Sequence, residues 1–185
     1  MISLKVKVLN ASSKKTRCEL KKAFADLLQE KKVIKNITIK ELVTKAGITR
    51  ATFYTHYDNI YEIAEEIQDE FLDVLFQDFD LLNSKEALEN HSSKIINHLK
   101  ENEILYKKLL SSDEPLIFIN RLNRLMTKRL NEFIINHKCE AKQLDIKFFV
   151  DGITSITLKY FRNEINTSLD ELANYTINLY DKLFK

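Results

Sequence analysis

Glycine and proline are almost absent from this chain of 185 residues, which holds two glycines and one proline. Sandwiches and barrels of short β-strands use both residues at their turns, so their scarcity argues against a β-rich fold. Apolar residues instead recur at helical spacing almost throughout. The sequence therefore predicts an all-α protein, and its length allows one domain, or a small domain attached to a larger one.

Cysteine and long apolar runs are also scarce. Nothing in the separation of the two cysteines, Cys18 and Cys139, demands a disulfide. No run approaches the ~18 apolar residues of a membrane span. The first ten residues alternate apolar side chains with lysine, so they lack the uninterrupted core of a signal peptide. We expect a cytoplasmic protein, in which thiols stay reduced.

Motifs for catalysis or metal binding are missing as well. The histidines at 56, 91, 98 and 137 are scattered. Neither the seven-residue spacing of His91 and His98 nor the pair His137-x-Cys139 matches a zinc finger or an H-E-x-x-H metal site. Glycine is too rare for a phosphate-binding loop. We therefore expect no enzyme, no metal site and no cofactor.

The segment from Thr38 to Tyr57, TIKELVTKAGITRATFYTHY, predicts two short helices joined by a tight turn. Thr38 and Glu41 form a T-x-x-E capping box that begins the first helix. Gly47 suits the left-handed residue at its end, and Thr49 can cap the second helix. Two helices joined by a glycine-containing turn of roughly 3–4 residues form a helix-turn-helix, whose second helix enters the major groove of DNA. The segment therefore predicts DNA binding.

The run AGITRATFYTHY resembles the recognition segment of the TetR family of bacterial transcriptional regulators. The likeness extends from about Lys14 to Ile67. It implies a helix-turn-helix head on a helical body that dimerises and usually binds a ligand. One position departs from the family, which often has a lysine just inside the next helix, where Ile60 stands. The loss of that phosphate contact should slightly weaken DNA binding.

Several side chains of the predicted head are candidates for DNA contact. Arg50 suits direct base reading, because a guanidinium can address guanine O6 and N7 together. By resemblance, Tyr54 and His56 contact backbone phosphates. The hydroxyls of Thr49, Thr52 and Thr55 can meet phosphates or bases, whereas Lys40 and the helix N-terminus at Thr38 can meet a phosphate. Phe53 should be buried beneath the helix, and we prefer core packing for Tyr57. The DNA-binding candidates are Thr38, Lys40, Thr49, Arg50, Thr52, Tyr54, Thr55 and His56.

Charge is unevenly distributed along the chain. Residues 1–60 hold thirteen Lys and Arg against five Asp and Glu, whereas residues 61–185 hold sixteen against twenty-two. A basic N-terminal third is the electrostatic footprint expected for a DNA-binding head, although a solvated lysine-rich helix would also be basic. We expect residues 1–12 to form a flexible arm, or a basic extension that contacts DNA phosphates.

The apolar pattern predicts about nine helices. The inward side of the first would carry Leu20, Phe24, Leu27 and Leu28. We place a DNA-binding domain at residues 1–58 and a regulatory and dimerisation domain at residues 59–185. The expected helices cover residues 14–31, 38–46, 49–56, 59–82, 84–102, 103–111, 115–137, 140–163 and 168–184.

The last two helices are the candidate dimer interface, because in the family they form a four-helix bundle with a partner's pair. The pattern F-x-x-G-I-x-x-I also resembles C-terminal domains of TetR-like regulators from low-GC Gram-positive bacteria, although the tryptophan often found near Tyr160 is absent. The alternative is that the apolar faces of these two helices form the core of a single chain. The candidate interface residues are Phe149, Gly152, Ile153, Ile156, Tyr160, Leu172, Tyr175 and Leu179.

The body should also hold an effector, since family members usually bind a ligand there. Each candidate residue can equally be plain core, because aromatic side chains at helical spacing normally pack. A largely apolar pocket with few polar anchors is expected. The candidate pocket residues are Phe71, Phe76, His98, Tyr106, Phe118 and Phe148.

These observations favour a homodimeric transcriptional repressor that binds double-stranded DNA at a palindromic operator and responds to a small molecule. Two alternatives stay open. One is a TetR-like activator or co-regulator controlled by a protein partner. The other is a helical interaction protein that has lost DNA binding.

Overall fold

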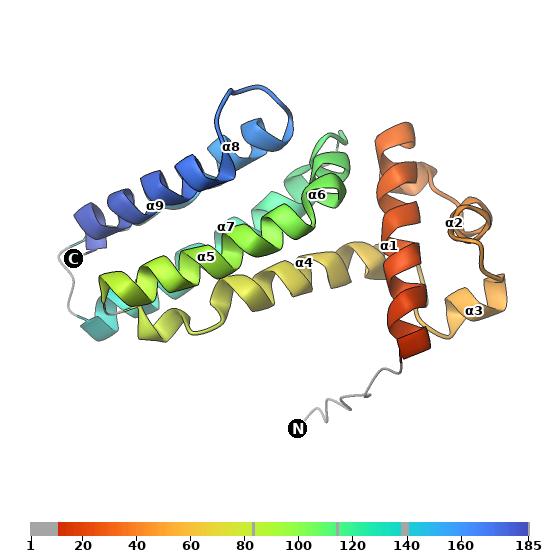
Figure 1. Cartoon of the computed structure of the whole chain (residues 1–185), viewed down its shortest axis with the longest axis horizontal. Helices are drawn as coiled ribbons and strands as arrows, with labels where there is room; N and C mark the ends of the chain where they lie inside the picture. The colour runs from red at the N-terminus through yellow and green to blue at the C-terminus, as the bar shows by residue number, and fades with distance from the viewer. Residues whose placement is uncertain (1–10, 83, 114, 138–140, 185) are drawn as a thin grey trace. The chain divides into compact units, whose positions relative to one another are not determined.

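The computed structural model describes residues 11–82, 84–113, 115–137 and 141–184, and these residues form nine α-helices and two short 3₁₀ helices with no strand (Figure 1). The predicted all-α fold is therefore confirmed. The chain divides into two compact units, one ending at Ile67 and the other beginning at Gln68. This division falls inside a helix, whereas the expected boundary near residue 58 concerns roles and stays a prediction.

The first unit is built on a long first helix. Leu20, Phe24, Leu27 and Leu28 of that helix are buried, as its pattern predicted. The arm expected at residues 1–12 lies outside the described residues, except that residues 11 and 12 already belong to the helix. The elements of the first unit are α1 (Ala11–Lys31), η1 (Ile34–Asn36), α2 (Ile39–Ala46), α3 (Arg50–Tyr54) and the first turns of α4 (Tyr61–Phe76).

The turn between α2 and α3 follows from local chemistry. Thr38 Oγ1 accepts the Glu41 N–H at 3.3 Å, and the Glu41 carboxylate accepts the Thr38 N–H at 3.0 Å, so the predicted capping box forms. Gly47 adopts φ 67° and closes α2, a conformation that glycine reaches without a Cβ clash. Thr49 Oγ1 then accepts the Thr52 N–H at 3.0 Å and begins α3.

The capping box should make the stability of the first unit depend on pH. A hydrogen bond from Lys31 and further bonds from Thr38 lower the pKa of Glu41 to about 2. Because the pKa of Glu41 is lower in the folded chain than in the unfolded one, its contribution is present above about pH 4.5 and is lost as pH falls toward 2. Thermal unfolding across this range should show the loss, and Glu41→Gln should reduce it. Equal pH dependence in both proteins would contradict this role.

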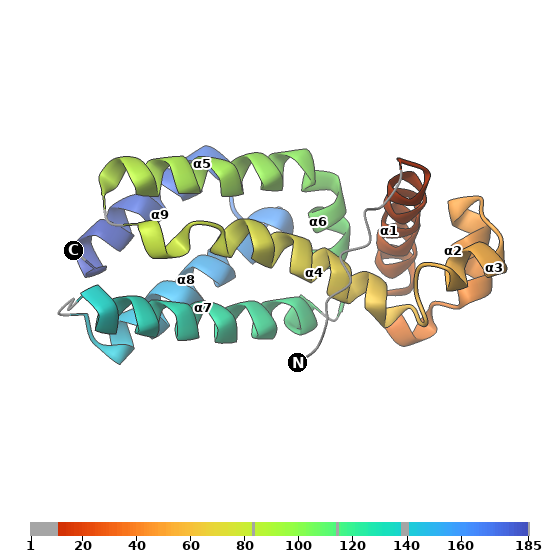
Figure 2. The same ribbon diagram turned by 90° about the horizontal axis from the view of Figure 1, so that it is seen from below.

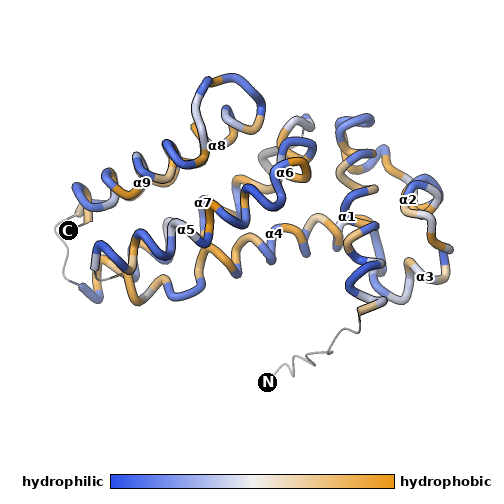
Figure 3. Tube along the Cα trace, in the orientation of Figure 1, coloured by the Kyte–Doolittle hydropathy of each residue, from blue (hydrophilic) through white to orange (hydrophobic). Residues whose placement is uncertain are grey.

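The second unit is a bundle of helices around an aromatic core. Helix α8 lies against α6, α7 and α9, while α9 lies against α5. In Figure 2 the later turns of α4 run between α5 and α7. Figure 3 shows apolar positions gathered along one side of the helices and polar ones along the other. Besides α4, the elements are η2 (Phe79–Leu81), α5 (Lys85–Glu101), α6 (Glu103–Leu110), α7 (Pro115–His137), α8 (Gln143–Phe161) and α9 (Leu169–Phe184).

Helix α4 is shorter than its sequence pattern predicted. It ends at Phe76 instead of continuing toward Leu82, because Asp78 adopts a left-handed conformation with φ 58°. This turn lets Phe79 and Leu82 enter the core, where Phe79 meets Phe133. Aspartate tolerates the left-handed region better than most residues, so neither glycine nor proline marks the break.

Candidate nucleic-acid interface

Helix α3 has one buried side and one exposed side. Phe53 is 0 % exposed and Tyr57, just beyond the helix, is also buried, so the packing predicted for both is confirmed. Their rings lie 5.9 Å apart. Arg50, Tyr54 and Thr55 face solvent. The buried rings therefore fix α3 to the unit and leave its other side free for a partner.

The exposed side of α3 carries a cation over an aromatic ring. Arg50 Nη2 donates a hydrogen bond to the Tyr54 hydroxyl oxygen at 3.2 Å. The Arg50 guanidinium carbon lies 5.6 Å from the centroid of the Tyr54 ring. Residues four apart share one face of a helix, which brings these two side chains together. They place a charge and a hydroxyl at one point of the surface.

The threonines of the turn and of α3 form a small hydroxyl network. The Oγ1 atoms of Thr49 and Thr52 lie 2.9 Å apart, and Thr55 Oγ1 donates to the Thr52 carbonyl at 2.7 Å. His56 is half-buried beside Tyr57, with ring centroids 6.5 Å apart. The hydroxyls of Thr49 and Thr52 therefore already form hydrogen bonds at the start of α3. Any contact of these hydroxyls with DNA would be additional to those bonds.

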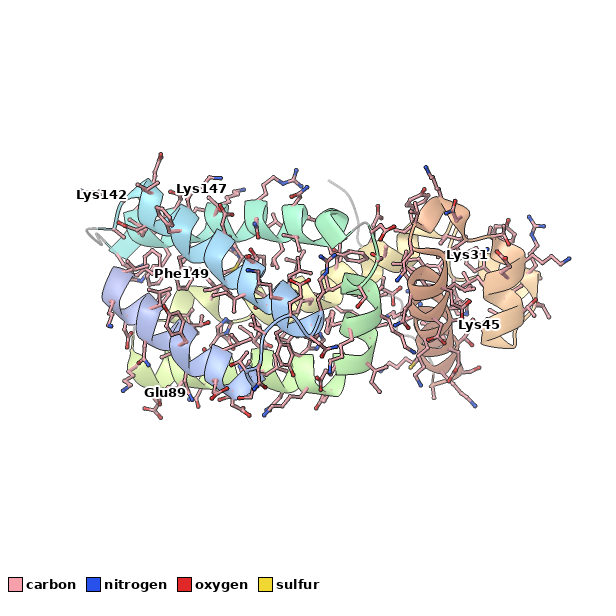
Figure 4. The ribbon with its side chains drawn as sticks, turned by 90° about the horizontal axis from the view of Figure 1, so that it is seen from above. Lys31, Lys45, Glu89, Lys142, Lys147 and Phe149 are labelled. Atoms are coloured by element: carbon pink, nitrogen blue, oxygen red, sulfur yellow. The ribbon has the colours of Figure 1, made fainter. Side chains whose placement is uncertain are left out.

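Several cations of the first unit are already paired. Lys31 Nζ meets a Glu41 oxygen at 2.6 Å, and Lys45 Nζ meets a Glu30 oxygen at 2.7 Å. Each pair joins α1 to α2, and the two lysines are labelled in Figure 4. The hydrogen bond to Glu30 raises the pKa of Lys45. Lys40, by contrast, extends from an exposed position near the start of α2, beside the exposed Thr38.

Ile60, which stands where the resemblance led us to expect a lysine, is buried in the first unit. Its side chain thus contributes to the core on which α4 begins. The helix itself begins as its sequence predicted, since Asn59 Oδ1 accepts the N–H groups of Tyr61 and Glu62 at 2.9 and 3.3 Å. The apolar substitution is therefore accommodated by packing.

A charged cluster that sequence reasoning missed joins α1 to α4. Glu66 pairs with Arg17 and with Lys21, the latter at 2.8 Å, and the Arg17 guanidinium lies 5.2 Å from the Tyr57 ring centroid. Burial, the largest single influence, raises the pKa of Glu66, but the hydrogen bond and charge of Lys21, the hydrogen bond of Tyr57 and the charge of Arg17 together outweigh it, so the net shift is downward. Arg17 and Glu66 are 49 residues apart, so no local sequence pattern indicates this pairing.

A protein-family comparison decides the identity of the chain. The family model TetR_C_8, described as "Transcriptional regulator C-terminal region", matches residues 86–182, slightly more than half of the chain. The chain belongs to the TetR family of transcriptional regulators. The resemblance that the recognition segment indicated is confirmed.

Relatives of this TetR-family regulator agree with that conclusion. A segment of 51 residues is 47% identical to the "Uncharacterized HTH-type transcriptional regulator YxbF" of Bacillus subtilis (strain 168). The match covers 28% of this chain and only 13% of the curated relative.

Solved structures share the fold. The "Dihydroxyacetone kinase operon activator DhaS" has a TM-score of 0.62 at 22% identity, covering 92% of this chain and 98% of that one. A TetR transcriptional regulator from Streptococcus agalactiae 2603V has a TM-score of 0.60 at 21% identity, covering 93% and 95%. At such identities the likeness establishes the fold alone.

Three of the six candidate pocket residues of this TetR-family chain come together. His98 Nε2 lies 2.8 Å from the Tyr106 hydroxyl oxygen, and the Phe71 ring centroid lies 6.0 and 5.9 Å from those two rings. Burial lowers the pKa of His98, against the opposing charges of Glu70 and Glu101. These contacts make a polar pair beside the aromatic ring of Phe71.

The other three candidate pocket residues lie elsewhere. Phe76 packs on Phe79, with centroids 6.0 Å apart, and Phe118 is half-buried on α7. Phe148 is 70 % exposed, so its predicted place in an interior pocket is wrong. The register of α8 explains this, because Phe149 takes the inward position and turns its neighbour to solvent.

The candidate dimer residues of this TetR-family chain fall into three groups. Phe149 is only 3 % exposed (Figure 4). Its ring meets the Phe184 ring edge-on, with the centroids 5.2 Å apart, so its predicted place at an interface is wrong. Tyr160 is half-buried, and its hydroxyl donates to a Glu103 oxygen at 2.9 Å. Exposed side chains are Ile156 and Tyr175; the half-buried residues are Gly152, Ile153, Leu172 and Leu179.

Two further findings concern the described part of the chain. No three His, Cys, Asp or Glu side chains converge there in a way that could hold a metal ion. No helix among the described residues is long and apolar enough to cross a membrane.

Proposed function

We propose that this TetR-family regulator is a cytoplasmic repressor that binds a palindromic operator as a homodimer and is released by a small-molecule effector. In this proposal residues 1–58 read DNA and residues 59–185 bind the effector and dimerise. The observation that carries it is the exposed side of α3, where Arg50 and Tyr54 stand on a helix held by the buried Phe53.

The division of labour within the head follows from chemistry. Arg50 reads a base, because its planar fork can give two hydrogen bonds to guanine O6 and N7. Lys40, Tyr54 and His56 contact phosphates, together with the hydroxyls of Thr38, Thr49, Thr52 and Thr55 where these reach beyond their local bonds. Phosphate contacts fix register and orientation, whereas base contacts supply sequence preference.

Fluorescence anisotropy tests the proposed reading function. The purified protein is titrated onto DNA from upstream of its own gene and onto scrambled DNA of equal length, at several salt concentrations. We expect dimer-stoichiometric preference for an inverted repeat, with log affinity falling by about 0.9 per log salt for each phosphate contacted. Equal, weak binding to both DNAs, followed by no enrichment from random DNA, would favour an interaction protein instead.

The exposed apolar side chains of α8 and α9 support dimerisation. Leu144, Phe148 and Ile156 lie exposed on α8, and Tyr175 lies exposed on α9. Exposed apolar groups that share neighbouring helices mark interaction surfaces more often than isolated ones do. A second copy of the chain placed here would give two heads for half-sites roughly 34–36 Å apart, or a multiple of that spacing.

Phe148→Glu should weaken the dimer without unfolding the chain. A two-fold interface would lose the substituted side chain twice, so we expect the dimer dissociation constant to rise by about tenfold or more. Analytical ultracentrifugation measures this. The matched control is Ile104→Glu on α6, since Ile104 is exposed to 72 % and Phe148 to 70 %. Equal effects of the two substitutions would remove Phe148 from the interface.

The effector is proposed to be largely apolar with one hydrogen-bonding group. The pair of His98 and Tyr106 beside Phe71 supports this, because it offers two polar atoms among aromatic rings. Binding there would involve α4, α5 and α6, and α4 begins within the head.

An activator is the second candidate, favoured by the fold shared with an operon activator. Transcription in vitro from a promoter that carries the selected operator separates the two. Added protein should lower the transcript yield of a repressed promoter. A raised yield would identify an activator.

A further inference from the structure

We propose that Tyr54 positions Arg50 for base reading, so that Tyr54 controls sequence preference and does more than contact the DNA backbone. The inference rests on the proposed role of Arg50 as the base-reading residue. It adds a function to a tyrosine whose expected partner was a phosphate.

Arg50 is held by two contacts, both from Tyr54. The Arg50 guanidinium carbon lies 5.6 Å from the Tyr54 ring centroid, and Arg50 Nη2 donates to the Tyr54 hydroxyl oxygen at 3.2 Å. A cation over an aromatic face is attracted by the ring quadrupole, and a planar guanidinium suits such a face better than an ammonium does. A long, exposed side chain is thereby kept in one region of the surface.

Tyr54 can serve as a support because its own ring contacts a buried ring. Tyr54 is 46 % exposed, yet its ring meets the Phe53 ring edge-on with centroids 5.3 Å apart. Phe53 is fully buried beneath α3. The chain of contact therefore runs from the core through Phe53 and Tyr54 to Arg50.

The contact leaves the reading edge of Arg50 free. A guanidinium carries five N–H donors, of which the Tyr54 hydroxyl uses one. A bidentate bond to guanine needs two more. The Tyr54 hydroxyl accepts from Arg50, so its own proton remains available for a phosphate oxygen. One tyrosine can thus hold the reader and touch the backbone together.

A double-mutant cycle tests the proposal on the selected operator and on scrambled DNA. Tyr54→Leu removes ring and hydroxyl, Tyr54→Phe removes the hydroxyl alone, and each is combined with Arg50→Ala. On the operator, we expect Tyr54→Leu to cost about 2- to 5-fold more affinity in the presence of Arg50 than in its absence. On scrambled DNA the two losses should be equal. Tyr54→Phe should retain part of the coupling.

Equal losses on the operator with and without Arg50 would overturn the proposal and leave Tyr54 as a phosphate contact only. A wild-type protein that prefers no DNA, even after selection from random sequences, would overturn this inference together with the proposed function. A clear operator preference without coupling would overturn this inference alone.

A measurement on the free protein tests the same contact without DNA. Protons of the Arg50 side chain above an aromatic ring should show an upfield shift in the NMR spectrum. We expect that shift in the wild type and in Tyr54→Phe, and its loss in Tyr54→Leu. Identical Arg50 shifts in all three proteins would contradict the contact between the guanidinium and the Tyr54 ring.

Discussion

Phe53→Ala is expected to lower the free energy of unfolding of the first unit by about 3–5 kcal/mol, because it removes a fully buried phenyl ring and leaves a cavity. The ring lies beneath α3 and contacts both Tyr54 and Tyr57. Its loss should therefore release the recognition helix. Chemical denaturation followed by circular dichroism measures the stability, and operator binding should fall in parallel.

The neighbouring Tyr54→Ala supplies the control for Phe53→Ala. Tyr54 is 46 % exposed, and substitutions at exposed sites usually change stability by within about 0.5 kcal/mol. This variant should stay folded while losing DNA affinity. If both variants proved equally stable, α3 would not be anchored through Phe53.

Arg50→Ala is expected to cost about 1–3 kcal/mol of operator binding and to relax the base preference at one position of each half-site. Arg50 is exposed and lies at the start of α3, so the fold should persist. Anisotropy titrations on the operator and on a set of single-base variants measure the effect. An unchanged order of preference among those DNAs would show that another residue reads the base.

Lys40→Ala is the matched comparison for Arg50→Ala. Lys40 is a second exposed cation, on the neighbouring helix α2. As a phosphate contact it should weaken operator and random DNA alike and reduce the salt slope by about one. The contrast between the two variants separates loss of charge from loss of base reading.

Much of the first unit could be predicted from its sequence, because its determinants are local. The capping box at Thr38, the left-handed Gly47 and the cap at Thr49 each act within a few residues of chain. The burial of Phe53 and Tyr57 follows from the face of the helix that they share with the core. Short sequence motifs determine such features, so they can be predicted without a structure.

The second unit was harder to predict, because its details depend on packing between distant segments. The sequence offers two adjacent rings, Phe148 and Phe149, and only the contacts of α8 with α9 select Phe149 for the core. The early end of α4 similarly depends on Phe79 finding a place against Phe133. The pairing of Glu66 with Arg17 joins residues 49 positions apart, which no local pattern reveals.

Selection of duplexes from a random DNA pool, followed by sequencing, tests the central claim most directly. A dimer that reads DNA through α3 should enrich an inverted repeat with half-sites roughly one or more helical turns apart. The Arg50→Ala variant, used in a parallel selection, should enrich the same repeat with a weaker base preference at one position of each half-site. Failure of the wild type to enrich any sequence, or an identical motif from both proteins, would contradict base reading by Arg50 on this helix.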